Sequence, residues 1–299
     1  MGVIWGMPYL LIKEAVATLS PAAVVAGRTL GGALLLLPIA TRQGVLRPAL
    51  GHWRWVVTFG VIEMAGPFML LSHAEQTLPS GLTGLLVSTV PLVSAMIGFA
   101  RGERSALGVG RIVGLTVGIA GVALVVGGGG DGTIGALGIA EVLLTSVCYA
   151  IAPFIVATHL RDVPALGSIV ISLGVVGLGY LPVAFATQQT TPTFRSVAAL
   201  VALGVLCTAI AFVVFFALIA EIGPTRAPLI TYINPVVALA LGVILLDETI
   251  SATMMAGIPL ILVGCWLAAG GDNPTPRAEP SSSGITAPSP AGPAGPPSA

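Results

Sequence analysis

Two apolar stretches of this sequence repeat one another: GLTGLLVSTVPLVSAMIGFARGE, from Gly81 to Glu103, and TRAPLITYINPVVALALGVILLDE, from Thr225 to Glu248. In each stretch a helix-like apolar run carries a central proline, Pro91 or Pro235, and ends in a short acidic turn. Internal symmetry of this kind in a very apolar chain indicates a membrane protein built from two homologous halves, as many transporters are.

The composition supports a membrane environment. The chain is 56% hydrophobic and 8% charged, whereas an ordinary soluble domain is roughly 25% charged. The net charge is zero and no large basic surface can form, which argues against nucleic-acid binding. Cys148, Cys207 and Cys265 are far apart in apolar runs, so we expect buried side chains and predict neither a metal site nor a cofactor.

Apolar segments long enough to cross a membrane follow one another along most of the chain. They predict an all-α fold with ten transmembrane helices, at 1–19, 21–40, 53–76, 79–100, 107–127, 133–157, 164–186, 196–220, 224–246 and 251–270. Ser20-Pro21 is a typical helix start, and Pro79, Pro164 and Pro224 are expected to open helices likewise. The tail at 271–299, with eight prolines, is predicted to be disordered.

The first predicted helix is short. Its apolar run ends at Ile12, before Lys13-Glu14, and it has neither the charged start nor the cleavage site of a signal peptide. We therefore expect that the natural start of this helix lies upstream, with a tilted and stunted helix as the alternative.

The basic residues predict how the chain is oriented. If the first helix enters from the cytoplasm, the even-numbered connections and the tail hold nine of the twelve basic residues, and the odd-numbered connections hold Lys13 and Arg195. By the positive-inside rule, both termini are expected to be cytoplasmic. Because each half has five helices, the second half is predicted to be inverted relative to the first.

Several motifs recur in the order expected of a known family. In the first half they are Trp5-Gly6, Tyr9, Pro21, Arg28, Pro91, Gly102-Glu103, Gly114 and Gly121. In the second half they are Pro235, Asp247-Glu248, Gly257 and Gly264. Over residues 1–270 this pattern resembles the drug/metabolite transporter (DMT) superfamily, in its EamA-type ten-helix branch. The resemblance implies two five-helix repeats, 1–127 and 133–270, in a bacterial cell (inner) membrane. His73 departs from the pattern, since an aromatic is common there.

Ionisable residues within the apolar segments are the first candidates for the site, because each needs a partner, a wet cavity or a function. Glu63 lies about halfway along the third segment and could bind an amine or exchange a proton, or could be a neutral acid bonded between helices. Arg28 could hold a substrate carboxylate, pair with Glu63, or extend to the outer interface.

Aromatic and polar residues near prolines are the second group of candidates. Trp5, Tyr9, Tyr149, Tyr232 and Asn234 are expected to line a cavity, and Pro91 and Pro235 to bend helices so that backbone carbonyls can meet a ligand. The alternative is that the prolines only bend helices and the aromatics fill space. The remaining charged residues are expected near water: His73, Glu75, Glu141, Glu221 and the acidic turns at Glu103 and Asp247-Glu248, which would cap helices or pair with arginines.

These observations favour a secondary transporter that exports small amphipathic metabolites such as amino acids by alternating access, with or without proton coupling. Its partners would be the small-molecule substrate and membrane lipid, with a homodimer as one option for its assembly. Two alternatives on the same fold are a lipid flippase and a non-transporting assembly protein. A membrane-embedded enzyme fits less well, because the three histidines are scattered and the spans contain no paired acids.

Overall fold

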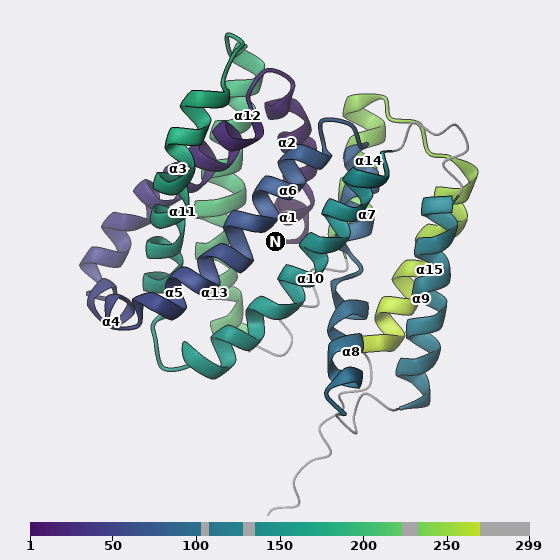
Figure 1. Ribbon diagram of the computed structural model, residues 1–299. Helices are drawn as coiled ribbons and strands as arrows, with labels where there is room; N and C mark the ends of the chain where they lie inside the picture. Colours follow the sequence, from purple (N-terminus) through teal and green to yellow (C-terminus); the bar gives the residue numbers. More distant parts are fainter. Residues whose placement is uncertain (103–107, 128–134, 223–232, 270–299) are drawn as a thin grey trace, which may run out of the picture.

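The protein is seen in a computed structural model that describes residues 1–102, 108–127, 135–222 and 233–269. These ranges hold helices and turns and no β-strand (Figure 1). Seven helical segments are long and apolar enough to span a membrane. They are Pro21–Arg42, Trp53–Ala74, Ser80–Ala100, Val109–Gly127, Ala136–His159, Ala165–Thr187 and Phe194–Phe215.

Several of these spans are built from shorter helices and two π-helical turns, η1 and η3. The first part of the chain contains α1 (Gly2–Gly6), α2 (Pro8–Val16), α3 (Pro21–Arg42), α4 (Leu46–Gly51), α5 (Trp53–Gly60), η1 (Val61–Ala65), α6 (Gly66–Ala74), α7 (Ser80–Val87), α8 (Val90–Ala100) and α9 (Val109–Gly127). The second part contains α10 (Ala136–His159), α11 (Ala165–Thr187), α12 (Phe194–Gly204), η3 (Val205–Ile210), α13 (Ala211–Ile222), α14 (Asn234–Leu246) and α15 (Ala252–Ala269).

The helices follow the predicted segments closely, with local differences. The segment predicted at 79–100 is divided into α7 and α8. The first segment is divided into α1 and α2 at Met7, because Pro8 follows directly and lacks the N–H that a continuous helix needs. The segment predicted at 224–246 is described only from residue 233 onward, where α14 forms. Because α14 and α15 are shorter apolar helices, a total of ten membrane spans stays a prediction.

The helix starts have clear local causes. Ser20 caps α3, since its hydroxyl oxygen accepts a hydrogen bond from the Ala23 amide at 3.2 Å and Pro21 is the first helical residue. Pro79 and Pro164 directly precede α7 and α11, where an extended residue before the helix is needed. Pro224 lies outside the described residues.

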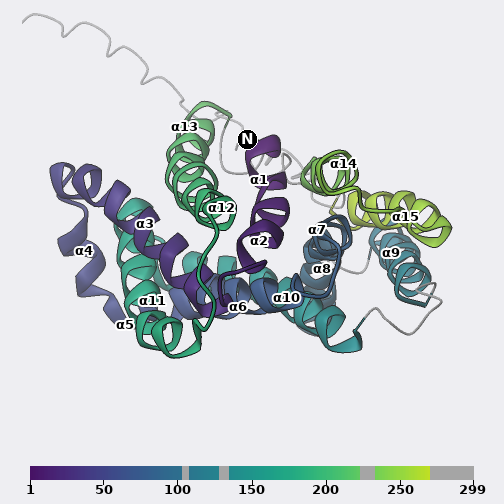
Figure 2. The ribbon, with the colours of Figure 1, turned by 90° about the horizontal axis from the view of Figure 1, so that it is seen from above.

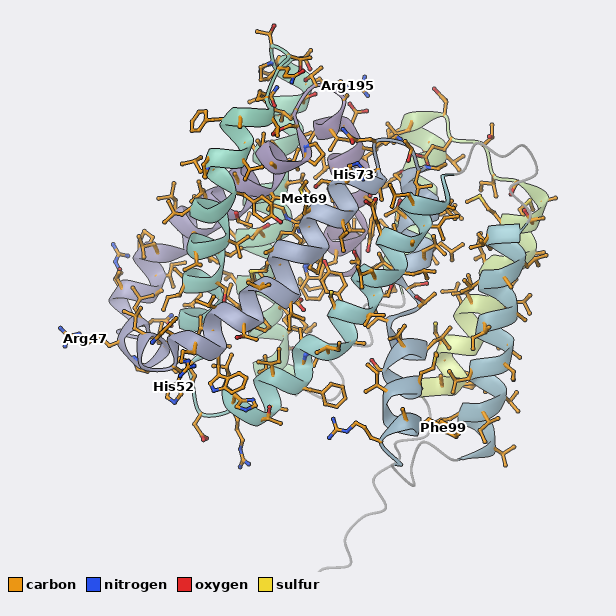
Figure 3. All side chains as sticks on the ribbon, viewed as in Figure 1. Arg47, His52, Met69, His73, Phe99 and Arg195 are labelled. Carbon is orange, nitrogen blue, oxygen red and sulfur yellow. The ribbon has the colours of Figure 1, made fainter. Side chains whose placement is uncertain are left out.

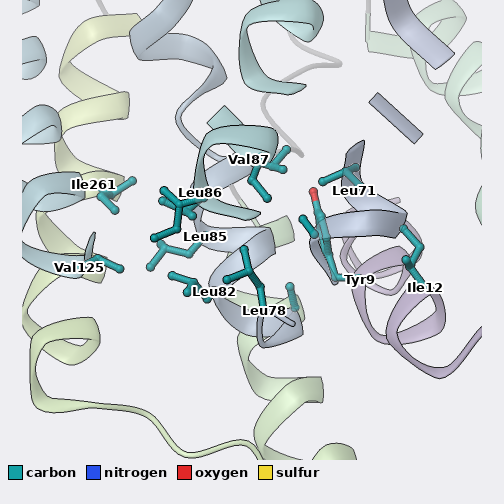
Figure 4. Packing of buried hydrophobic residues seen from close by; sticks show 14 of the residues in the cluster. Tyr9, Ile12, Leu71, Leu78, Leu82, Leu85, Leu86, Val87, Val125 and Ile261 are labelled. Carbon is teal, nitrogen blue, oxygen red and sulfur yellow. The ribbon is translucent and has the colours of Figure 1, made fainter. Parts of the chain in front are cut away.

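The largest hydrophobic core runs across the molecule, and Figure 4 shows it from close by. Leu82, Leu85 and Leu86 of α7 are almost fully buried at its centre. On one side the core reaches α9 and α15, and on the other it reaches α2 and α6, where Ile12 and Leu71 lie. Helices α7 and α8 therefore link the α9–α15 pair to the rest of the molecule.

Helices α9 and α15 pack side by side at one edge of the molecule (Figure 2). Their contact depends on glycines: a Cβ added at Gly264 would lie 2.5 Å from the backbone N and Cα of Gly118. A Cβ at Gly114 would lie 2.5 Å from the backbone N of Ala268. Small residues at such crossings let two backbones approach closely in lipid, where apolar burial does not drive helix association.

Large apolar side chains cover much of the outer surface. Leu34, Phe185 and Ile244 are among them, and each exposes well over half of its side-chain surface. Exposed apolar surface on this scale is unfavourable in water and matches a lipid environment.

Replacing Gly264 with alanine should destabilise the protein. The added methyl group meets backbone atoms that cannot rotate away, so we expect a loss of about 1–3 kcal/mol. The matched control is Gly110→Ala on α9, since a Cβ there meets nothing within 4 Å. Thermal unfolding in detergent would measure both variants, and equal midpoints would contradict the close packing of α9 on α15.

Candidate functional site

A cavity of about 680 Å³ lies in the middle of the helical assembly. Most of the candidate residues from the sequence line this cavity. They are Trp5, Tyr9, Arg28, Glu63, Tyr149, Asn234, Pro91 and Pro235. Tyr232, the remaining candidate, lies outside the described residues. The sequence pattern therefore identified one place in the fold, although the candidates come from segments far apart in the chain.

The cavity reaches one end of the molecule and stops short of the other. At one end its lining includes Leu160, Val163 and Ala165, in and beside the connection between α10 and α11. At the other end the lining stops at Ile12, Leu71 and Gly84. We call the first the cavity end and the second the closed end; in Figure 1 the closed end lies toward the top.

Basic side chains lie at both ends of the molecule. Figure 3 places Arg47 and His52, with Phe99, toward the cavity end, and Arg195 and His73 toward the closed end. Arg195 forms an ion pair with Glu14, its Nη2 donating to Oε1 at 2.6 Å, which joins α12 to α2 at the closed end.

Arg28 is buried in α3, and its guanidinium is held by two groups. Its Nε donates to the Thr208 hydroxyl at 3.3 Å, and its guanidinium carbon lies 3.8 Å from the centre of the Phe68 ring. Because the side chain is buried, it does not extend to the outer interface. No described residue accepts a hydrogen bond from its two terminal nitrogens, so the forked face of the guanidinium can meet a ligand.

Glu63 lies in η1 and lines the same cavity. The described contacts include neither an ion pair between Glu63 and Arg28 nor a hydrogen bond to the Glu63 carboxyl group. A carboxyl group inside an apolar span is costly unless it is neutral, solvated or bound to a ligand. The two charged residues of the cavity are therefore held separately, each with an unoccupied polar face.

Aromatic side chains make up much of the remaining lining. Phe215 packs on Trp5 with ring centres 4.7 Å apart, and Tyr9, Phe68 and Tyr149 line the cavity as well. Such rings offer large apolar contact, and the tyrosine hydroxyls add polar groups at defined points. The cavity can thus bind a molecule with an apolar body and charged ends.

The two π-helical turns both border the cavity. Glu63 lies in η1, and Cys207 and Thr208 lie in η3. The wider turns free backbone carbonyls, which side chains then satisfy: the Tyr180 hydroxyl donates to the Ala65 carbonyl at 3.0 Å, and the Thr208 hydroxyl donates to the Leu203 carbonyl at 3.0 Å. Single π-helical turns of this kind often mark functional sites. No feature of the sequence predicted these two turns.

The prolines that were predicted to bend helices lie at helix starts. Helix α7 ends at Val87 and α8 begins at Val90, so Pro91 lies in the first turn of a new helix. Pro235 lies in the first turn of α14, after Asn234. The buried Asn234 side-chain oxygen receives no hydrogen bond from the described residues and borders the cavity.

Several charged residues near the closed end differ from the sequence expectation or refine it. His73 is half exposed and pairs with Glu141 of α10, its Nδ1 2.8 Å from Oε1. Glu75, expected to face water, is instead fully buried, in a turn to which Lys13 of α2 and Glu248 form hydrogen bonds. Glu248 caps α7, as the capping interpretation of the acidic turns predicted. Glu103 lies outside the described residues.

An all-helical fold with an apolar surface and a central cavity holding Arg28 and Glu63 defines a multi-pass membrane protein. Comparison with known families then identifies the class. The model of the EamA-like transporter family matches residues 1–127 and 136–270, and the chain belongs to this family, within the drug/metabolite transporter type.

Proteins similar to this chain are named as transporters. An uncharacterized transporter of Bacillus subtilis, YvbV, is 24% identical over 89% of this chain and 88% of its own. The uncharacterized inner membrane transporter YedA of Escherichia coli K12 is 26% identical over 83% of this chain and 81% of its own. One solved crystal structure shares the fold, with a TM-score of 0.63 at 20% identity, over 89% of this chain and 93% of that chain.

The contact between Thr208 and Arg28 should contribute to stability. In Thr208→Val the shape is kept, but the acceptor for Arg28 Nε and the donor to the Leu203 carbonyl are both lost, so we expect a loss of about 1–3 kcal/mol. Thr116→Val, at an exposed position on α9, is the matched control. Thermal unfolding in detergent measures the difference, and a Thr208→Val midpoint equal to that of the control would mean that the contact carries no stability.

Proposed function

We propose that this protein is a secondary transporter that exports small amphipathic metabolites, with amino acids as the leading class, by alternating access. The observation that carries the proposal is the central cavity, which reaches one end of the molecule, stops short of the other, and holds two separately positioned charged groups. The cavity end would face the cytoplasm, from which the solute enters.

A substrate with opposite charges fits the polar groups of the cavity. The terminal nitrogens of Arg28 match the geometry of a carboxylate, and the Glu63 carboxylate can bind an ammonium group. The aromatic lining would contact the apolar part of the molecule. Because Thr208 and Phe68 already hold the guanidinium, the arginine loses little conformational entropy when it binds the solute.

Correspondence between the two halves supports an inverted repeat. Pro91 and Pro235 are 144 residues apart (235 − 91), and η1 and η3 begin at Val61 and Val205, which are also 144 apart (205 − 61). The packing shows the same offset. Gly60 faces Ser172, and Gly204 faces Arg28, so both glycines and both partners are related by 144 residues.

An inverted repeat gives a physical route to alternating access. If the two halves can exchange conformations, the closed arrangement of one end can form at the other while the central site stays in place. The two π-helical turns are suited to such a change, because their carbonyls are held by side chains that can be released without breaking the rest of the helix.

The charge distribution supports a cytoplasmic position for the cavity end. Arg42, Arg47, Arg54, Arg101 and Arg161 belong to or flank the connections at this end, whereas Lys13 and Arg195 belong to the closed end. By the positive-inside rule the closed end would then face outward. This orientation also gives a cytoplasmic C-terminus.

The cavity weighs against one of the alternatives. A non-transporting assembly protein would be expected to have a filled centre, which is hard to reconcile with a volume of about 680 Å³ around Arg28 and Glu63. A lipid flippase stays an alternative, since the cavity is also rich in apolar side chains, and the transport assay below separates it.

Glu63→Gln should impair transport without unfolding the protein. We expect the initial rate for amine-bearing solutes in proteoliposomes to fall at least about tenfold, since an amide cannot supply the negative charge; tenfold corresponds to about 1.4 kcal/mol. The control is Glu141→Gln, because Glu141 pairs with His73 and is not part of the cavity lining.

The assay uses a panel of solutes with and without a pH gradient, together with a fluorescent lipid. Unchanged transport in Glu63→Gln would remove Glu63 from the mechanism. Movement of lipid alone would replace the metabolite exporter with a flippase, and movement of neither would contradict transport altogether.

A further inference from the structure

The closed end contains a buried acid that the cavity site does not use. Glu75 directly follows α6, and its side chain is fully inaccessible to solvent. Neither carboxyl oxygen receives a hydrogen bond from any described residue, and the hydroxyl of the nearby buried Ser80 is also unpartnered. A buried carboxylate without donors is strongly unfavourable, so this position favours the neutral, protonated acid.

Two charged side chains fix the turn that carries Glu75. Lys13 of α2 donates from Nζ to the backbone carbonyls of Glu75 and Leu78, both at 2.8 Å. Glu248, after α14, accepts hydrogen bonds from the amides of Ser80 and Gly81 at 2.6 and 3.0 Å. The ammonium thus meets the C-terminal end of α6 and the carboxylate meets the N-terminal end of α7, each complementing the helix dipole.

These contacts join the turn to both halves of the chain. Lys13 comes from the first helical segment and Glu248 from the connection between α14 and α15, while the turn itself links α6 to α7. Separation of the helices at the closed end would therefore break the contacts of Lys13 or Glu248 with the turn. It would also bring water to the Glu75 carboxyl group.

The charges facing Glu75 come from several elements. Burial raises the pKa of its carboxyl well above the ordinary range, Glu248 adds to the rise, and Lys13 and Arg28 oppose it. Tyr9 of α2 lies within electrostatic reach, and Glu141 on α10 is already paired with His73. The ammonium of Lys13 lies at the carbonyl of Glu75 itself and would repel a bound metal cation, so a proton is the ligand that fits.

We propose that Glu75 is the proton-binding site that controls the closed end of this transporter. In the closed state the carboxyl group is protonated and buried; when the end opens, it meets water, releases its proton to that water and becomes a carboxylate. The reverse step takes a proton from the outer solution and allows the turn to pack again. This inference rests on the proposed alternation of access, to which it adds the ion and its binding residue.

Proton linkage fixes the direction of the pH effect. The closed state holds the proton more tightly than the open state, so acid stabilises closure. As the pH rises through the closed-state pKa of Glu75, the open state gains population, by up to about tenfold per pH unit for a single proton. The effect should disappear when residue 75 cannot titrate.

The proton-binding role of Glu75 can be tested by measuring how fast an impermeant thiol reagent reaches the closed end at different pH values. A reporter cysteine is placed at the buried Thr83 of α7, in a chain whose three native cysteines are replaced by alanine. Right-side-out vesicles are labelled from outside between about pH 5 and 9. Rates are divided by those of a Thr191→Cys reporter at an exposed position, which removes the intrinsic pH dependence of thiol reactivity.

We expect the ratio of the Thr83→Cys labelling rate to the Thr191→Cys labelling rate to rise with pH when residue 75 is glutamate. In Glu75→Gln, which mimics the protonated acid, this ratio should stay low at every pH. Glu14→Gln, a nearby acid paired with Arg195, should keep the pH-dependent profile. A flat profile in the unchanged chain, or a profile that persists in Glu75→Gln, would overturn the proposal.

If Glu75→Gln fails to fold, Glu75→Asp should retain the pH dependence with a shifted midpoint, and an unshifted midpoint would overturn the assignment. The labelling needs no transported solute. A flat profile beside intact transport would therefore refute only the proton site, whereas a Glu75-dependent profile without any transport would refute only the proposed function.

Discussion

The structure depends on one constraint: inside a membrane every backbone polar group needs a partner within the protein. The interruptions at η1, at η3 and at the α6–α7 turn obey it. The carbonyls freed in η1 and η3 are met by the hydroxyls of Tyr180 and Thr208. The helix ends at the α6–α7 turn are met by Lys13 and Glu248. These irregular segments lie beside the cavity or at the closed end, which are the places where function would require movement.

The same constraint explains how the charged side chains are used. Arg28, Lys13 and Glu248 are each bound to fixed groups, so they can remain charged in a poor solvent. Glu63 and Glu75 are different, because no described residue donates a hydrogen bond to either carboxyl group. One faces the cavity and the other is sealed at the closed end. We assign the first to solute binding and the second to proton binding on this difference.

The sequence located the described helices to within a few residues and marked several residues that line the cavity, for physical reasons. Apolar runs of membrane length and capping signals such as Ser20-Pro21 locate helices without tertiary information. Costly ionisable groups such as Arg28 and Glu63 pointed to the cavity because they need a special environment. The family assignment that the sequence suggested is confirmed by the match over both halves of the chain.

The remaining features depend on tertiary contacts that a sequence does not display. Glu75 ends a helix, where water is the usual neighbour, and its burial follows from the packing of α2 and the α14–α15 connection around it. The π-helical turns likewise depend on partners in other helices, such as Tyr180 for Ala65. Arg28 was recognised, but Phe68 and Thr208, which hold it, were not.

The most direct test of this account asks from which side of the membrane the cavity can be reached. A single cysteine at Ser94, a cavity-lining position on α8, would be labelled with an impermeant reagent in inverted and in right-side-out vesicles at acidic pH. We expect rapid labelling in inverted vesicles and little labelling in right-side-out vesicles. Rapid labelling from the outside alone, or equally from both sides, would contradict a central site closed to the outside.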